Sequence, residues 1–202
     1  MTPRYSETNR RQARKEVRQR LIEAAIQEFA QNGYDGANVN TISVAAGFAK
    51  GTIYNYFPSK KELMFAILGE SGSAHFDFIA EQIREEDDPI LRVKCFFEAG
   101  FAFVEEDPAR GQVLVSTLYG THSEFKERLY QVYQPMFQLV AEEILAPGIV
   151  QGVFRQMDPA DTSVMIMTFY LGTASSVDTS GKPWLSPGKV ADFVLNAIRS
   201  NQ

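Results

Sequence analysis

The sequence predicts an all-α protein, in which an N-terminal three-helix helix-turn-helix domain is joined by a continuous helix to a C-terminal helical domain. Apolar residues recur three or four positions apart along most of the 202 residues, and no segment alternates with the period of two that a strand needs. Gly, Pro and capping residues divide this pattern into helix lengths. At 45% hydrophobic, the chain has enough apolar material for a substantial core. We place the domains at residues 1–58 and 59–202.

The N-terminal domain contains three predicted helices before the connecting one. The first runs from about residue 10 to 32, and Gly33 follows as its stop. Asn38 caps a short second helix that Gly47 ends. A third spans about residues 50–57, where Pro58 forbids continuation. Ser59-Lys60-Lys61-Glu62 is a capping box, so a fourth helix begins at Lys60 and runs past residue 79.

The C-terminal domain is punctuated by acidic residues followed by proline. Asp88-Pro89 opens a helix that ends near Asp107-Pro108, and a further pair crosses residues 110–150 with an interruption around Pro135. Asp158-Pro159 starts another, and residues 178–187 form a loop rich in Ser, Gly and Pro. The last helix carries a full apolar stripe.

Charge is divided unevenly along the chain. Residues 1–68 hold 10 Lys and Arg against 6 Asp and Glu, a net charge of +4, whereas residues 69–202 hold 10 against 19, a net charge of −9. Such asymmetry predicts a polyanionic partner for the N-terminal domain alone, although a solvated helix start explains the charge equally well.

Other classes of protein lack support in the sequence. We read neither a membrane span nor a secretion signal, and the single cysteine, Cys95, fits a reducing compartment, so we expect a cytoplasmic protein without membrane contact. His75, Cys95 and His122 are scattered, so we expect no metal site and no cofactor. No phosphate-binding loop or nucleophile motif is present, so we expect no enzyme.

Residues 46–63, AGFAKGTIYNYFPSKKEL, carry the strongest functional signal. Two short helices joined by a glycine-containing turn can place the second helix in a DNA major groove. Because Ile53 and Phe57 face the core, the polar side chains between them can contact bases and phosphates, unless the two tyrosines are ordinary core-edge aromatics. The predicted DNA-binding residues are Thr41, Lys50, Gly51, Thr52, Tyr54, Asn55, Tyr56 and Lys60. For Lys60, the start of the fourth helix adds the positive end of its dipole.

Residues 14–65 resemble the DNA-binding domain of the tetracycline-repressor (TetR) family of bacterial transcription regulators. The resemblance covers about a quarter of the chain and is carried by Phe29, Gly33, Tyr34, Val39, Ile42, Ala45, Gly47, Lys50, Gly51, Tyr54, Tyr56, Phe57, Lys60, Glu62 and Leu63. One position departs from the family pattern, because Ala49 stands where similar proteins have a capping Ser or Thr. A lost cap costs about 1 kcal/mol, so we expect another group, or bound DNA, to satisfy the amides there.

The resemblance implies a homodimer, a palindromic operator on double-stranded DNA, and an unknown small-molecule effector whose binding lowers DNA affinity. The sequence supports a four-helix dimer interface independently, because two C-terminal segments are strongly apolar, unless both stripes face the chain's own core. The predicted interface residues are Met165, Phe169, Gly172, Ser176, Val190, Phe193, Val194 and Ala197. An aromatic pocket for a hydrophobic or amphipathic effector is predicted from Phe97, Phe101, Tyr119, His122, Phe125, Tyr133, Phe137, Phe169 and Tyr170.

The predicted function is therefore a ligand-responsive DNA-binding regulator, and repression is the commoner outcome for similar proteins. Two alternatives are a helical protein-interaction module and a regulator without a small-molecule effector. The operator sequence and the effector do not follow from the residues.

Overall fold

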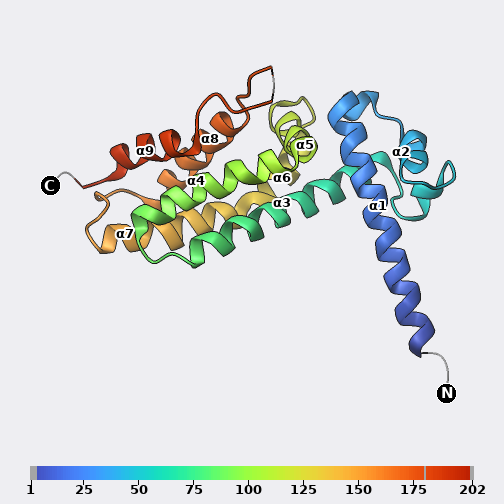
Figure 1. The fold of residues 1–202 in the computed structure, drawn as a ribbon, viewed down its shortest axis with the longest axis horizontal. Coiled ribbons are helices and arrows are strands. Elements are labelled where there is room, and N and C mark those ends of the chain that lie inside the picture. Colours follow the sequence, from blue (N-terminus) through green and yellow to red (C-terminus); the bar gives the residue numbers. More distant parts are fainter. Residues whose placement is uncertain (1–3, 180, 201–202) are drawn as a thin grey trace. The chain divides into compact units, whose positions relative to one another are not determined.

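A computed structural model describes residues 4–179 and 181–200, which fold into helices and connecting loops in two compact units, residues 1–68 and 69–202. The described residues contain no β-strand beyond two isolated bridges, which confirms the all-α class. The division between residues 58 and 59 expected from the sequence stays a prediction. The helical elements are α1 (Arg4–Gly36), α2 (Val39–Ala45), the 3₁₀ helix η1 (Thr52–Asn55), α3 (Lys60–Arg84), α4 (Pro89–Glu106), α5 (Pro108–Tyr119), α6 (Ser123–Gln138), the π-helical segment η2 (Leu139–Leu145), α7 (Ala146–Val150), α8 (Pro159–Ala174) and α9 (Pro187–Ile198) (Figure 1).

In the N-terminal unit, α1 packs against α2, and α2 packs against η1. Their contact is closed by fully buried aliphatic side chains such as Leu21, Ile42 and Ile53. Asn38 caps α2 as predicted, because its side chain accepts the amide of Asn40 at 2.9 Å. Short elements of this kind are stable through the common core and not through their own length.

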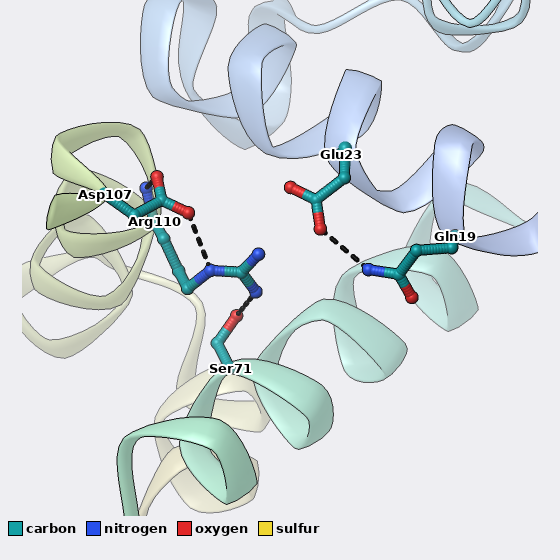
Figure 2. Close-up of polar contacts among 5 residues, drawn as sticks. All are labelled: Gln19, Glu23, Ser71, Asp107 and Arg110. Carbon is teal, nitrogen blue, oxygen red and sulfur yellow. Dashed lines mark hydrogen bonds and ion pairs between the residues drawn. The ribbon is translucent and has the colours of Figure 1, made fainter. Parts of the chain in front are cut away.

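Helix α1 is longer than the sequence pattern indicates. It begins at Arg4 instead of about residue 10, and its first two turns lie ahead of the apolar stripe. Gly33 breaks it as expected, since this residue has φ +66° and ψ 175°. Hydrogen-bonded side-chain pairs one turn apart lie on its exposed side. In one of them the Gln19 amide donates to the Glu23 carboxylate at 2.7 Å (Figure 2).

The predicted third helix over residues 50–57 is shorter and tighter than expected. Only residues 52–55 are helical, and they form a 3₁₀ turn in which Tyr54 N–H donates to the Gly51 carbonyl at 3.1 Å. Gly51 has φ +81°, a left-handed conformation that cannot continue into an α-helix, and Pro58 blocks extension at the other end. The residues between Gly51 and Pro58 therefore form a single helical turn.

The C-terminal unit is a bundle in which α4 lies beside α9, and α8 packs against α6 and η2 (Figure 1). The acidic residues before proline act as predicted. The Asp88 carboxylate accepts the amides of Ile90 and Leu91, and that of Asp158 accepts the amide of Asp161. Between the helices lies a core rich in aromatic residues, including Phe96, Phe97, Phe101, Phe125 and Tyr170.

The interruption expected around Pro135 appears one turn later. Pro135 lies inside α6, and the chain continues into the π-helical segment η2 at Leu139. Proline removes one amide donor from the helical ladder, which favours a change of register nearby. The Arg84 guanidinium fixes this segment to α3 with hydrogen bonds of 3.0 and 2.7 Å to the Glu143 carboxylate and holds the pKa of that carboxyl below its usual range.

The described residues between α8 and α9 form backbone pairings with one another. Val177 pairs with Pro183 in an isolated bridge, and the Trp184 amide donates to the Ser176 carbonyl at 3.0 Å. Trp184 is the chain's single tryptophan and remains 72% exposed at the end of this loop.

Candidate DNA-binding surface and ligand cavity

The turn between α2 and η1 is shaped by glycine and held by an arginine. Gly47 has φ +82°, and a β-carbon there would lie 2.7 Å from Arg20 Nη2. The same guanidinium donates to the Ala46 carbonyl at 2.7 Å and lies over the Phe48 ring at 4.8 Å from its centroid. Arg20 therefore anchors the turn to α1, a role that its place in a basic run did not indicate.

Ser43 supplies a side-chain hydrogen bond to η1, whose own N-cap residue, Gly51, makes none. Its buried hydroxyl accepts the Ile53 amide at 3.3 Å, which lies at the start of η1. A side-chain cap at residue 49 would accept the amides of residues 51 or 52, and the Thr52 amide donates to the Ala49 backbone carbonyl at 3.1 Å instead. The bond from Ser43 crosses from α2 to η1, so it also fixes the orientation of the two elements.

The eight predicted DNA-binding residues lie on or beside this pair of elements and differ in exposure. Tyr54 is 52% exposed. Tyr56 is only half-buried, and the Arg14 guanidinium lies 5.7 Å from the centroid of its ring. The exposed members are Thr41, Lys50, Tyr54 and Asn55, and the half-buried ones are Gly51, Thr52, Tyr56 and Lys60.

Lys60 is engaged within the protein. Its ammonium donates to the carbonyls of Ala37 at 2.7 Å and Asp35 at 3.1 Å, and it lies 4.9 Å from the centroid of the Tyr34 ring. These contacts join the start of α3 to the end of α1. The prediction that this side chain holds a phosphate assumed an outward ammonium, which the structure does not show.

The C-terminal unit contains a cavity among α3, α4, α5, α6 and α8. About 50 Å³ of it is accessible to the centre of a water molecule, within about 620 Å³ of atom-free space that includes open solvent. Aliphatic side chains dominate its wall, and Tyr130, which is 57% exposed, lies at its edge. The lining residues are His75, Val104, Gly111, Leu114, Val115, Leu118, Leu129, Tyr130, Tyr133, Phe137, Tyr170, Leu171, Ala174 and Ser175.

Three of these residues form a buried hydrogen-bonded chain. The Tyr170 hydroxyl donates to the Gly100 carbonyl at 2.9 Å and lies 2.9 Å from His75 Nε2. A hydroxyl carries one hydrogen, so Nε2–H must donate to it, and Nδ1 accepts from the Tyr133 hydroxyl at 2.7 Å. We call Tyr133, His75, Tyr170 and the Gly100 carbonyl the relay. Burial lowers the pKa of His75 from 6.5 to about 3 and raises the pKa of both tyrosines, so every member is neutral.

Close approaches between helices place the relay and the cavity wall. A β-carbon on Gly100 would lie 2.6 to 2.8 Å from Tyr170 ring and hydroxyl atoms, so glycine allows the ring to reach the α4 backbone. The N-terminus of α5 is tied to α3 by Arg110, which donates to Asp107 at 2.8 Å and to the buried Ser71 hydroxyl at 3.0 Å (Figure 2). The α5 wall is therefore fixed at its first turn.

The structure separates the aromatic residues predicted for the pocket. Tyr133, Phe137 and Tyr170 line the cavity. Phe97, Phe101 and Phe125 are closed in the core, whereas Tyr119 is 64% exposed. His122, half-buried beside Phe125, and Phe169, stacked on Phe193, are not among the lining residues. His75 was not among the predicted pocket residues, because the position of a lone histidine in an amphipathic helix does not indicate whether it lines a cavity.

The residues predicted for the dimer interface also divide. Val190 and Val194 are buried in the chain's own core. Met165 is 68% and Phe193 is 64% exposed, and the rings of Phe193 and Phe169 stack with centroids 5.2 Å apart. Ala197 and Ser176 are exposed and Gly172 is half-buried. A shallow hollow lined in part by Met165, Phe169, Phe193 and Ala197 lies across α8 and α9.

Within residues 4–179 and 181–200, no group of three or more His, Cys, Asp and Glu side chains is arranged to hold a metal ion. No helix in the described part of the chain combines the length and apolar character of a membrane span.

Fold and surface together define a helix-turn-helix regulator with a separate helical unit that contains a cavity. Residues 21–67 match the model of the bacterial regulatory proteins of the tetR family. The solved structure of the fatty acid degradation regulator FadR from Bacillus halodurans has a TM-score of 0.82 at 26% sequence identity, over 92% of this chain and 97% of that one. The chain belongs to the TetR family of bacterial transcriptional regulators, a family of DNA-binding proteins.

Two further proteins are similar to this chain. The fatty acid metabolism regulator protein of Bacillus subtilis is 25% identical over 136 residues, which cover 67% of this chain and 70% of that protein. The structure of FadR from Bacillus subtilis in complex with stearoyl-CoA has a TM-score of 0.77 at 22% identity, over 88% of this chain and 95% of that one, a likeness of fold. With several other curated relatives, the match spans about half of the relative's length.

Proposed function

We propose that the protein is a homodimeric cytoplasmic repressor that binds a palindromic operator and leaves it when a fatty acyl compound, of the acyl-coenzyme A class, fills the cavity of the C-terminal unit. The observation that supports this class of effector concerns the polar side chains of the relay, which line the cavity. Their polar atoms already form hydrogen bonds with other protein atoms.

The hydrogen-bonding groups of the relay bond to one another and to the Gly100 carbonyl. Tyr133 donates to His75, which donates to Tyr170, which donates to Gly100. The Ser175 hydroxyl donates to the Gly172 carbonyl at 3.2 Å, and no buried side-chain nitrogen or oxygen of the described residues lacks a partner. A polar ligand group placed deep in this cavity would lose its hydration without replacement, at a cost of about 1–3 kcal/mol. The buried part of the ligand is therefore hydrocarbon.

A hydrocarbon chain needs a polar end to be an aqueous signal, and the open edge of the cavity beside Tyr130 leaves room for one in solvent. This amphipathic pattern agrees with the relatives, two of which are described as regulators of fatty acid metabolism or degradation. A third was solved with stearoyl-CoA. These likenesses support an acyl chain as the buried portion and coenzyme A as the exposed one.

On the DNA side, we propose that η1 enters the major groove and that Lys50, Tyr54 and Asn55 contact bases and phosphates. These side chains are exposed on a turn whose backbone is fixed by Gly47, Gly51 and the Ser43 hydroxyl. In a two-fold dimer the two copies of η1 must lie about 34–36 Å apart to meet successive major grooves. A ligand that binds better to another spacing shifts the population away from the DNA-bound state.

For the dimer, we propose the face of α8 and α9 that carries Met165, Phe169, Phe193 and Ala197. Two large apolar side chains there are more than half exposed, and the flanking Gly172 permits close approach of a second helix. The buried Val190 and Val194 support the face from beneath instead of touching the partner. The alternative of a protein-interaction module has no comparable feature in its favour.

The test of the effector measures release of a DNA fragment selected by the protein from a random-sequence library. Palmitoyl-CoA should lower the affinity for this fragment about tenfold or more, whereas coenzyme A alone should not. Val115→Trp, which fills the cavity wall, should bind the fragment normally and lose the response. Val150→Trp, at a position 87% exposed on α7, is the matched control and should keep it. Release by coenzyme A alone, or an intact response in Val115→Trp, would reject an acyl chain in this cavity.

Native mass spectrometry of the purified protein tests whether it is a dimer. The same spectrum can detect an effector that remains bound. The wild type should appear as a dimer, and Phe193→Glu should appear as a monomer. Tyr119→Glu places the same charge at a side chain that is equally exposed, at 64%, and should leave the dimer intact. A dimeric Phe193→Glu would move the interface elsewhere.

A further inference from the structure

The first part of α1 is a helix without a core of its own. Every side chain from Glu7 to Glu16 is exposed, yet the helix continues through this stretch to Arg4. Within this stretch the Gln12 amide donates to the Glu16 carboxylate at 3.1 Å. A helix of this length without packing is marginal in water, so a partner that covers it would add to its stability. In Figure 1 it extends well beyond α2.

One face of this extension borders a groove that is shared with the recognition turn. The groove is lined by Arg10, Ala13, Arg14, Val17, Asn55 and Tyr56. The first four are spaced i, i+3, i+4 and i+7, so they form one stripe of α1. The stripe leads to the core residue Leu21 at i+11, which explains why the two arginines lie toward Tyr56.

The chemistry of the groove is suited to an oxyanion. Arg14 lies over the face of Tyr56, with its guanidinium carbon 5.7 Å from the ring centroid. A guanidinium stacked in this way keeps its N–H edge for bidentate contact with phosphate, and the ring limits its freedom before binding. Arg10 adds a second positive charge one turn away, and the Asn55 amide adds a neutral donor. No acidic residue lines the groove among the described residues.

We propose that this groove binds a phosphate of the DNA backbone, and that Arg10 and Arg14 extend the contact of each protomer beyond the bases reached by η1. The proposal rests on the DNA-binding function above and adds a second anchoring point to it. Because Asn55 and Tyr56 border the groove from the recognition turn, a phosphate held there also fixes how η1 enters the major groove. The exposed α1 extension is then covered in the complex by the DNA strand.

The test is the salt dependence of binding to a 30-base-pair duplex of arbitrary sequence, because phosphate contacts do not require a particular sequence. Affinity is measured by fluorescence anisotropy between about 50 and 200 mM salt. The double variant Arg10→Gln/Arg14→Gln should make the log–log slope less negative by about 1.8, since each of two protomers loses one phosphate contact worth ~0.9. Circular dichroism checks that the helix is retained.

The matched control is Arg11→Gln/Lys15→Gln, which removes the same charge from the same exposed turns but outside the groove. It should change the slope by much less than the groove variant. Equal changes in both variants, or none in either, would overturn the groove as a phosphate site while leaving the DNA-binding function standing. A wild type whose binding shows no salt dependence would instead reject the DNA-binding function itself.

Discussion

The two units of the molecule place their candidate functions in opposite environments. In residues 1–68 the candidate DNA-binding side chains are on the surface, and buried groups such as Ser43 only hold the backbone that presents them. In residues 69–202 the distinctive polar residues are buried in the relay, where Tyr133, His75 and Tyr170 bond to one another. Tyrosine side chains therefore have different proposed roles in the two units. At the surface we propose that tyrosine contacts DNA, and in the interior we propose that it limits which ligands can enter.

Removal of single tyrosine hydroxyls should show the largest difference between the units. Tyr170→Phe leaves the His75 Nε2–H without its acceptor, and we expect it to lower the free energy of unfolding by about 2–3 kcal/mol. Tyr133→Phe removes one bond and should cost about 1–2 kcal/mol. Tyr54→Phe, at an exposed site, should leave stability unchanged and weaken DNA binding. Chemical denaturation followed by circular dichroism measures all three, and a Tyr54→Phe loss as large as that of Tyr170→Phe would end the comparison.

The pH dependence of stability should come next in size. Burial lowers the pKa of His75 to about 3, below the 6.5 of an unfolded histidine. Between these values the unfolded chain binds a proton that the folded chain does not, so stability falls as pH falls, by about 1.4 kcal/mol per pH unit. From pH 7 to 5 the loss should be roughly 2 kcal/mol.

The control for this prediction is His75→Gln, which should lack that part of the slope although it is less stable at every pH. Denaturation at pH 7, 6 and 5 gives both curves. Parallel curves for the two proteins would mean that His75 becomes protonated without unfolding the bundle.

The smallest effect separates two lysines of the N-terminal unit. Lys60→Gln loses two charge-assisted hydrogen bonds, to the Ala37 and Asp35 carbonyls, and should destabilise this unit by about 1 kcal/mol, because the site is partly solvated. Lys50→Gln, at an exposed residue, should leave stability unchanged and reduce DNA affinity. A Lys60→Gln protein of full stability and weakened DNA binding would restore the phosphate contact expected from the sequence.

Sequence patterns predict the local features of this protein well. The caps at Asn38, Ser59 and Asp88 depend on residues two or three positions apart, and the structure shows all three hydrogen bonds. The 3₁₀ geometry of η1 was missed, because it depends on the left-handed Gly51 as well as on the apolar spacing. The DNA-binding residues stay predictions, but their exposure follows from the helical period.

The cavity is harder to predict because its wall is assembled from five helices. Tyr133, Phe137 and Tyr170 line it, whereas Phe97 and Phe101 have the same periodicity and are ordinary core. Only the tertiary contacts distinguish these groups. His75 takes its role from two tyrosines 58 and 95 residues away, a relation that no local pattern carries.

The loop between α8 and α9 has an optical consequence. Trp184 is the chain's single tryptophan and is 72% exposed, so it is already in contact with water in the folded protein. Its emission should therefore change little when the helical core melts, while the 8 tyrosines and the helical backbone report that event. Tryptophan fluorescence instead reports selectively on a molecule that binds against this loop.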